Sequence, residues 1–299
     1  MSGKLIIAVV GCRAYLTRLA TVRASWGATA QGNVEIAYFV GRGEAPMPDW
    51  VTQLDAPDDY DALPIKVHAV HRWLLGRDFA WLFKCDDDSF VVPERVLAEA
   101  RAMAPGAFLG APDFHPNFAG GGAGYLMTRD ASRRLADDPA PAPGPEDVIY
   151  SHRLIALGYD FRASPRLRHH SRDEDLPRPG NDIATCHWMS PLRLRERHDE
   201  MRGIVRAPAL AQALYAAEHD AWRGALALFD DGFFTGGGGS PDGLWRLEHD
   251  RLHIDWFSWP GDVLERHVDG WRNHQLSLTL SGGRFAARAE VELPMAQSA

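Results

Sequence analysis

The sequence predicts an α/β fold, with a mostly parallel sheet flanked by helices, followed by a small β-rich module. Short apolar runs alternate with segments of helical periodicity over the first two-thirds of the chain, as in sheets built from strand–helix–strand units. Beyond about residue 204, short strand-like runs separated by Gly and Asp replace this alternation. We therefore expect two domains, residues 1–204 and 205–299, which a chain of 299 residues with 45% hydrophobic side chains is long enough to form.

The first domain is expected to begin with a strand over residues 5–10. Its continuous apolar run is typical of a strand covered on both faces. Further strands are expected at residues 34–41, 81–85, 107–110 and 124–128. Helices are expected at residues 15–26, 65–75, 93–103 and 191–201. The polar stretch 166–181, with two prolines, is interpreted as a surface loop that holds His169 and His170 in solvent.

The second domain is expected to open with a helix over residues 207–222. Four short strands are then expected at residues 226–229, 244–247, 252–256 and 276–280. Residues 236–239 are all glycine, and we interpret them as a flexible hairpin connection. A phosphate-binding loop is not indicated, because no Lys-Ser/Thr pair follows them.

Charge and cysteine content exclude several classes of function. A formal net charge of -8 argues against nucleic acids and anionic membranes as partners, because both are bound mainly by clustered Lys and Arg. Cys12, Cys85 and Cys186 are odd in number and lack metal-type spacing, so reduced, buried thiols are expected. The first apolar run is too short to span a bilayer and is followed by no small-residue cleavage site, so we expect a cytoplasmic protein without a stable membrane anchor.

Three adjacent acids, Asp86, Asp87 and Asp88, follow the predicted strand at residues 81–85. The carboxyl ends of strands are where ligands bind in open α/β sheets. Three neighbouring carboxylates repel one another unless a cation neutralises them, and oxygen ligands favour Mg²⁺ or Mn²⁺. A divalent metal holding a diphosphate is the hypothesis this suggests. The alternative is a solvated acidic turn or helix cap.

Further short blocks accompany the acid triplet in a fixed order along about two-thirds of the chain. They are Arg-Ala-Ser-Trp-Gly at 23–27, Phe-Val-Gly at 39–41, an Asp-x-x-Asp-x-Tyr-x-x-Leu-x-x-Lys pattern at 55–66, a glycine-rich segment at 118–125, Glu-Asp-Val at 146–148 and His-Trp-Met-Ser-Pro at 187–191. In this order they resemble the β-1,3-galactosyltransferase and Fringe families of inverting glycosyltransferases.

The resemblance implies a GT-A fold over residues 1–204 and a UDP-sugar donor, with Mn²⁺ (or Mg²⁺) held between Asp88, His187 and the two phosphates. The other donor-binding residues that it implies are Arg23, Lys66, Asp86, Asp87, Gly121 and Gly122. The cations would offset diphosphate charge, and the glycines would let a sugar approach the backbone. Taken singly, the cations are also compatible with surface positions, the glycines with a tight turn and His187 with a structural role.

The resemblance further implies that Asp147 is the base that accepts the proton of an acceptor hydroxyl, a glycan hydroxyl or another one. The sugar, a hexose or N-acetylhexosamine, would then be transferred with inversion. Glu146 and Asp113 are the next carboxylates to consider. Without the resemblance, Glu146-Asp147 after a proline would indicate a helix first turn.

Two other classes of function remain open. A non-catalytic sugar- or nucleotide-binding protein would keep the fold while losing metal ligands or base, and those residues are present here. A metal-dependent hydrolase or phosphotransferase could use the acid triplet, but it would not need the Arg-x-Ser-Trp and His-x-x-Ser-Pro blocks. We expect the protein to differ from the animal members of these families in having neither a membrane anchor nor their luminal cysteine pattern.

Overall fold

A computed structural model describes residues 3–111, 118–206, 209–220, 222–237, 243–257, 261–274 and 278–285, and every structural statement below concerns these residues. The chain divides into two compact units. One comprises residues 1–189 and 193–204, and the other comprises residues 190–192 and 205–299.

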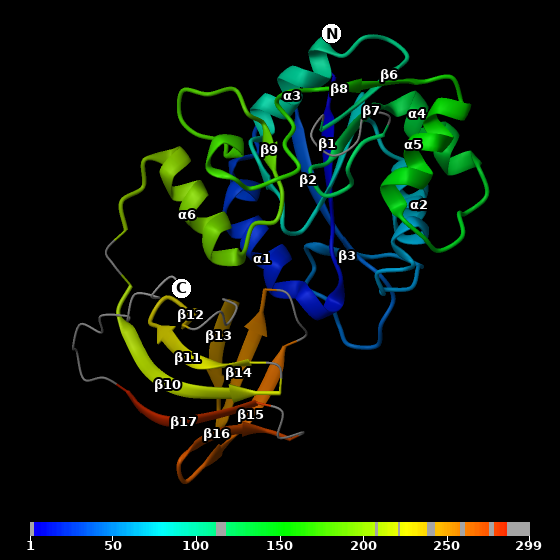
Figure 1. Ribbon diagram of the computed structural model, residues 1–299. Helices are drawn as coiled ribbons and strands as arrows, with labels where there is room; N and C mark the ends of the chain where they lie inside the picture. Colours follow the sequence, from blue (N-terminus) through cyan, green and yellow to red (C-terminus); the bar gives the residue numbers. More distant parts are fainter. Residues whose placement is uncertain are drawn as a thin grey trace. The chain divides into compact units, whose positions relative to one another are not determined.

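The first unit is built on a seven-stranded mixed sheet in the order β3-β2-β1-β4-β7-β6-β8 (Figure 1). Its strands are β1 (Leu5–Val10), β2 (Val34–Val40), β3 (Val51–Gln53), β4 (Trp81–Asp86), β6 (Ala107–Gly110), β7 (Tyr125–Thr128) and β8 (Asp160–Ala163). β1 pairs in parallel with β2 and β4, β2 with β3, and β6 with β8, whereas β7 runs antiparallel to both β4 and β6. The predicted sheet is therefore confirmed as mostly parallel, with β7 as the reversed strand.

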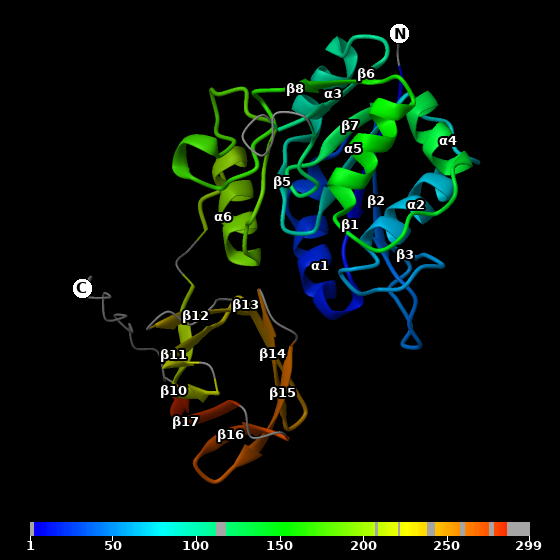
Figure 2. The same ribbon diagram turned by 45° about the vertical axis from the view of Figure 1, so that its right-hand side comes forward.

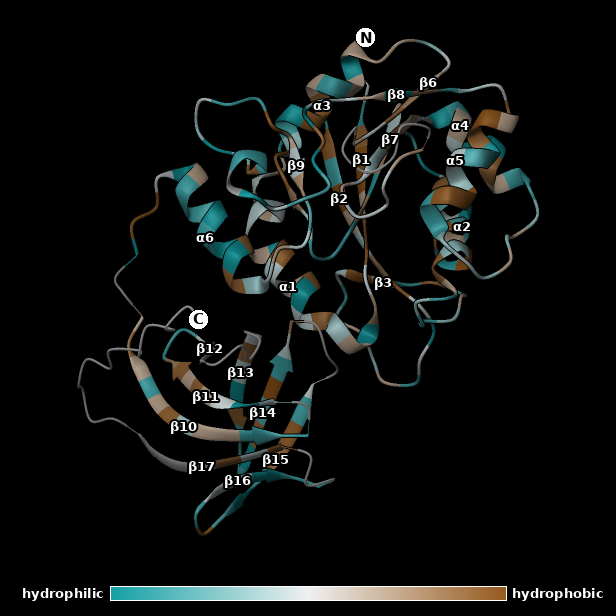
Figure 3. Cartoon of the chain, in the orientation of Figure 1, coloured by the Kyte–Doolittle hydropathy of each residue, from teal (hydrophilic) through white to brown (hydrophobic). Residues whose placement is uncertain are grey.

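Helices cover both faces of this sheet (Figure 2). They are α1 (Leu16–Ala24), α2 (Leu63–Leu74), α3 (Pro93–Ala102), α4 (Arg129–Asp137), α5 (Glu146–Ala156) and α6 (Pro191–Arg202). Side chains of α1, α3 and α6 share one core cluster, and those of α2, α4 and α5 share the other. β1 contributes alternate residues to the two clusters, which explains its unbroken apolar run (Figure 3). Within the described residues no helix is both long and apolar enough to cross a membrane.

A separate two-stranded sheet consists of β5 (Phe90–Val91) and β9 (Thr185–Cys186). Neither strand is predicted by the sequence patterns, because two residues are too short to show a period. The predicted loop at 166–181 contains one short 3-10 turn, η3 (Asp173–Asp175), and is otherwise irregular.

The second unit is a closed antiparallel barrel of eight strands, so a β-rich module is confirmed. The strands, in barrel order, are β10 (Ala211–His219), β11 (Trp222–Phe229), β12 (Phe233–Gly237), β13 (Gly243–Glu248), β14 (Arg251–Trp256), β15 (Asp262–His267), β16 (Gly270–Asn273) and β17 (Leu278–Phe285). β10 pairs with β17 and thereby closes the barrel. Aliphatic and aromatic side chains fill its core, the latter including Tyr215, Phe234, Trp256 and Trp271.

Two expectations for this unit are wrong. The helix expected over residues 207–222 is strand β10, whose side chains at Ala213, Tyr215 and Ala217 are buried in alternation with exposed neighbours. Its alanines favour a helix, but the period of two decides the structure in the barrel context. Of the glycines expected to form a hairpin connection, Gly236 and Gly237 belong to β12 and pair with β11, whereas Gly238 and Gly239 lie outside the described residues.

Candidate metal and donor-binding site

The acid triplet lies at the carboxyl edge of the sheet. Asp86 is the last residue of β4 and pairs with Val10, the last residue of the neighbouring parallel strand β1. Asp87 and Asp88 form the turn that leads into β5. All three acids line a cleft of about 470 Å³, together with Gly11, Arg18 and other residues. This is the edge at which open α/β sheets bind ligands.

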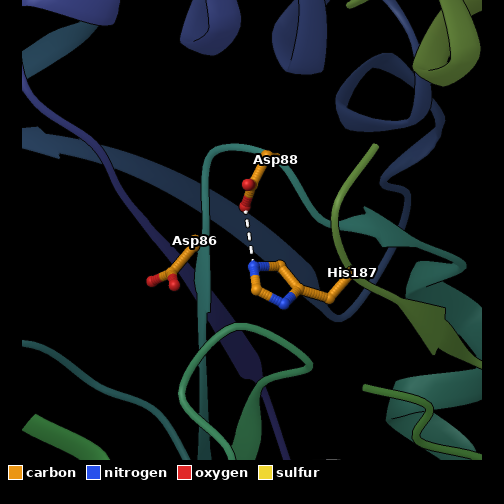
Figure 4. A group of neighbouring side chains, drawn as sticks. All are labelled: Asp86, Asp88 and His187. Atoms are coloured by element: carbon orange, nitrogen blue, oxygen red, sulfur yellow. Dashed lines mark ion pairs between the residues drawn. The ribbon is translucent and has the colours of Figure 1, made fainter. Parts of the chain in front are cut away.

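The pairing of β5 with β9 brings His187 to the acids from about one hundred residues away in sequence. Phe90 faces Cys186 in this pair, so His187, which follows β9, lies beside the turn that precedes β5. The backbone N–H of Met189 donates to the carbonyl of Asp88 at 2.9 Å. The imidazole Nε2 of His187 then lies 3.0 Å from Oδ1 of Asp88, as Figure 4 shows.

The residues present fit a divalent cation. One potential ligand atom from each of Asp86, Asp88 and His187 lies within 4.8 Å of the others. Among the described residues, Nδ1 of His187 and Oδ2 of Asp87 are buried without a hydrogen-bond partner, which marks the cluster as polar groups still to be satisfied. Burial lowers the pKa of His187, but the hydrogen bond and charge of Asp88, with the charge of Asp86, raise it overall. The raised pKa favours a proton on the imidazole of His187, and a bound cation would replace that proton.

Asp87 shows the repulsion expected of three adjacent acids. The pKa of Asp87 is raised to about 7. Burial is the largest cause, Arg18 lowers the pKa, and the charges of Asp88 and Asp86 raise it. Nη1 of Arg18 lies 3.4 Å from Oδ1 of Asp87 and 3.9 Å from Oδ2 of Asp88. Arg18 is thus the arginine of α1 that lines the cleft, and the sequence analysis did not select it.

Lys84 links the acid triplet to the start of α5. Its side chain is fully buried on β4, and its Nζ lies 2.7 Å from Oδ1 of Asp86 and 3.0 Å from Oε2 of Glu146. Burial raises the pKa of Asp86, but Lys84 lowers it overall, so this carboxylate stays ionised. Glu146 also accepts a hydrogen bond from the hydroxyl of Tyr125, and burial raises its pKa despite Lys84. Both oxygens of Glu146 are therefore engaged inside the protein.

Asp147 lies at the start of α5 and is half-buried. Its Oδ2 accepts the backbone N–H of Gly121 at 3.1 Å, and its Oδ1 accepts that of Val148 at 2.8 Å. Asp147 does not line the cleft, but its charge affects the pKa of Tyr60, a residue that lines the cleft. Burial raises the pKa of Tyr60, and the charges of Asp86 and Asp147 raise it further. Asp147 and Lys84, which pairs with Asp86, both bond to the backbone of Gly121.

The glycine-rich segment packs directly against these side chains. A Cβ on Gly122 would lie 2.1 to 2.3 Å from three ring atoms of His187, and a Cβ on Gly121 would lie 2.6 Å from Oε2 of Glu146. Only glycine leaves room for these neighbours. The expectation that these glycines admit a sugar is not tested by this packing.

Two predicted cations do not present a free charge to the cleft. Lys66 lines it, but its buried Nζ lies 2.9 Å from Oδ1 of Asp58 and donates to the carbonyl of Gly11. Arg23 does not line it; its guanidinium lies over the ring of Trp50, 5.1 Å from the centroid. Helical spacing explains this difference, because Arg18 and Arg23 are five residues apart on α1 and face different directions.

The expectation that His169 is solvated is wrong. It is buried, and its ring centroid lies 5.2 Å from that of His187. Asp113, the other carboxylate considered as a base, lies outside the described residues. The sequence analysis also missed Lys84, although residues two apart on a strand share a face and Lys84 precedes Asp86 by two.

Comparison with known proteins relates part of the chain to a sugar transferase. No family model matches the chain. Over 154 residues, the sequence is 29% identical to beta-1,3-galactosyltransferase 6 of Mus musculus, covering 48% of this chain and 41% of that protein. The sequence is similar to a glycosyltransferase. The chain spans about two-fifths of the length of this relative.

Among solved structures, the apo-form glycosyltransferase GlyE of Streptococcus pneumoniae TIGR4 aligns with a TM-score of 0.40 and 11% identity. The alignment covers 63% of this chain and 55% of that chain.

Proposed function

We propose that this protein is a Mn²⁺-dependent inverting glycosyltransferase that moves a hexose or N-acetylhexosamine from a UDP-sugar to the hydroxyl of a glycan acceptor. The observation that carries the proposal is the gathering of Asp86, Asp88 and His187 at the carboxyl edge of the sheet. The similarity to a galactosyltransferase supports it. We also propose that the first unit belongs to the GT-A class, on the resemblance of its sequence blocks.

Asp86, Asp88 and His187 would hold the cation, and Mg²⁺ is the alternative to Mn²⁺ because carboxylate oxygens suit both. When bound, the metal supplies Lewis-acid stabilisation of the negative charge that grows on the departing diphosphate. Arg18 adds a second positive charge at the same cleft.

Asp147 is the proposed base. The acceptor oxygen attacks the anomeric carbon while its proton passes to the Asp147 carboxylate. The bond from the anomeric carbon to the diphosphate oxygen breaks, its electron pair leaves with UDP, and the configuration inverts. Glu146 is less suited, because it is buried and its oxygens contact Lys84 and Tyr125, whereas Asp147 is only half-buried.

The test is incubation with radiolabelled UDP-sugars, Mn²⁺ and a panel of oligosaccharide acceptors. We expect acceptor-dependent labelled glycoside. Asp147→Asn should lower turnover by about 10²- to 10⁴-fold and leave UDP affinity nearly unchanged, because the base contacts the acceptor and not the diphosphate. Free labelled sugar without glycoside would indicate a hydrolase instead. Binding of UDP-sugar without any turnover would indicate a non-catalytic binding protein.

A further inference from the structure

Trp188 combines exposure with an unusual backbone conformation. It follows His187, lines the cleft and is 56% exposed. Its φ is 63°, in the left-handed region that bulky side chains rarely adopt. Such strain persists only where the surroundings impose it, and it is concentrated at ligand sites.

The neighbours of Trp188 impose this conformation. On one side, His187 is held by Asp88 through its imidazole. On the other, the backbone N–H of Met189 donates to the carbonyl of Asp88, and the Met189 side chain is buried in the core. Trp188 is therefore held between two fixed neighbours. It lines the cleft, whereas the side chain of Met189 is buried in the core.

No described imidazole stacks flat on this indole. The rings of His169, His170 and His187 have centroids 5.6, 6.0 and 5.6 Å from it, at angles of 62°, 71° and 49°. The cleft also presents polar side chains, including those of Arg18, Asp59 and Tyr60, and Tyr60 is 86% exposed. An aromatic face set among hydrogen-bonding groups suits a ligand with one apolar face and a polar rim.

We propose that Trp188 is a platform on which a pyranose ring stacks beside the metal cluster. A pyranose presents C–H groups on one face and hydroxyls around its edge, which matches this surface. The inference rests on the proposed function and deepens it. The ring is that of the acceptor or that of the transferred sugar, since both meet at the anomeric carbon during transfer, and the experiment below distinguishes them.

The kinetic test compares Trp188→Ala, Trp188→Phe and Trp188→Gly with the parent enzyme. Trp188→Ala should raise one KM by about 10-fold or more, the effect of losing a buried aromatic contact, while the Kd of UDP with Mn²⁺ changes less than about 3-fold. A rise in the acceptor KM identifies the acceptor ring, and a rise in the UDP-sugar KM identifies the transferred sugar. Trp188→Phe should restore most of the loss.

Trp188→Gly separates binding from stability. Glycine adopts a positive φ without strain, so the Tm of Trp188→Gly should not fall below that of Trp188→Ala. The rise in KM should be the same in both variants. Equal weakening of UDP binding and of sugar binding would overturn the proposal, because the indole would then hold the nucleotide or only shape His187. Unchanged KM values in Trp188→Ala would overturn it as well.

A second readout does not require turnover. Saturation-transfer NMR would be recorded with methyl β-galactoside, methyl β-glucoside and methyl N-acetyl-β-glucosaminide, each in the presence of UDP and Mn²⁺. The parent protein should give a saccharide signal that Trp188→Ala loses. If Trp188→Ala loses the saccharide signal but no donor supports transfer, the proposed function is wrong and the sugar-stacking role of Trp188 is still supported. An equal signal in Trp188→Ala, or none in the parent, contradicts the platform.

Discussion

At the level of single residues, the close approach of His187 to the backbone of Gly122 leaves no room for a side chain at that position. The sequence predicted that the glycine-rich segment and His187 belong to one site, but not that they touch. Contacts of this kind depend on the β5–β9 pairing, which no local pattern encodes. Arg23 was predicted to bind the donor, but Arg18 is the arginine of α1 that lines the cleft. A short block of similar residues does not show which face of α1 meets the sheet edge.

Gly122→Ala should therefore displace the imidazole and weaken Mn²⁺ binding by about 10- to 100-fold, the loss typical when a ligand's support is removed. The free Mn²⁺ signal in electron paramagnetic resonance measures this affinity directly. Gly76→Ala is the matched control, because a Cβ there meets nothing within 4 Å. Equal Mn²⁺ affinity in the two variants would show that His187 takes no part in the metal site.

His71 provides a pH test of the core. It is buried on α2, and its Nδ1 lies 2.9 Å from the hydroxyl of Ser132. Burial, together with the charge of His68, lowers the pKa of His71 to about 3. The unfolded chain takes up this proton near pH 6.5, so the free energy of unfolding should fall as the pH drops from about 6.5 towards 3, by up to about 1.4 kcal/mol per pH unit.

Urea unfolding of the parent and of His71→Gln between pH 7.5 and 4.5 measures this effect. The parent should lose more stability than the variant over that range, since the variant has no proton to bind at this position. Parallel pH profiles for the two proteins would refute the assignment.

At the level of elements, many strands and helices of the first unit follow from their patterns, because a long periodic segment indicates both the type of element and its buried face. β3, β8 and α4 were not predicted. β1, α2 and α3 lie within a few residues of their predicted positions. The failures are of two kinds. β5 and β9 are too short to show a period, and β10 is rich in alanine, so intrinsic propensity favoured a helix where barrel pairing decides.

The segment joining the two units gives a test at this scale. Residues 202–206 are all exposed, and they include two tryptic sites, Arg202 and Arg206. Limited trypsin digestion should release a fragment that runs from residue 1 to one of these arginines, because an exposed connection fits a protease more readily than packed strands do. Intact-mass spectrometry identifies it, and the variant with both arginines changed to Gln should lose it. Early cleavage within β1 to β4 instead would be incompatible with this division.

At the level of the whole molecule, the proposed site is assembled from parts of the chain that are distant in sequence. Asp86 ends the central strand β4, His187 follows β9, and Asp147 lies in the first turn of α5. The sequence indicated these members through their resemblance to a family, whereas the buried link through Lys84 and the exposed Trp188 required the structure. We propose above all that the first unit binds a nucleoside diphosphate through a metal.

Calorimetric titration of UDP into the protein, with Mn²⁺ and then with EDTA, tests that claim most directly. The parent should bind UDP only with Mn²⁺, and His187→Ala should lose at least about 10-fold in affinity. Asp55→Asn is the control, because Asp55 is exposed and lies outside the cleft, and it should bind as the parent does. UDP binding that is equally strong in EDTA, or equally strong in His187→Ala, would contradict the account.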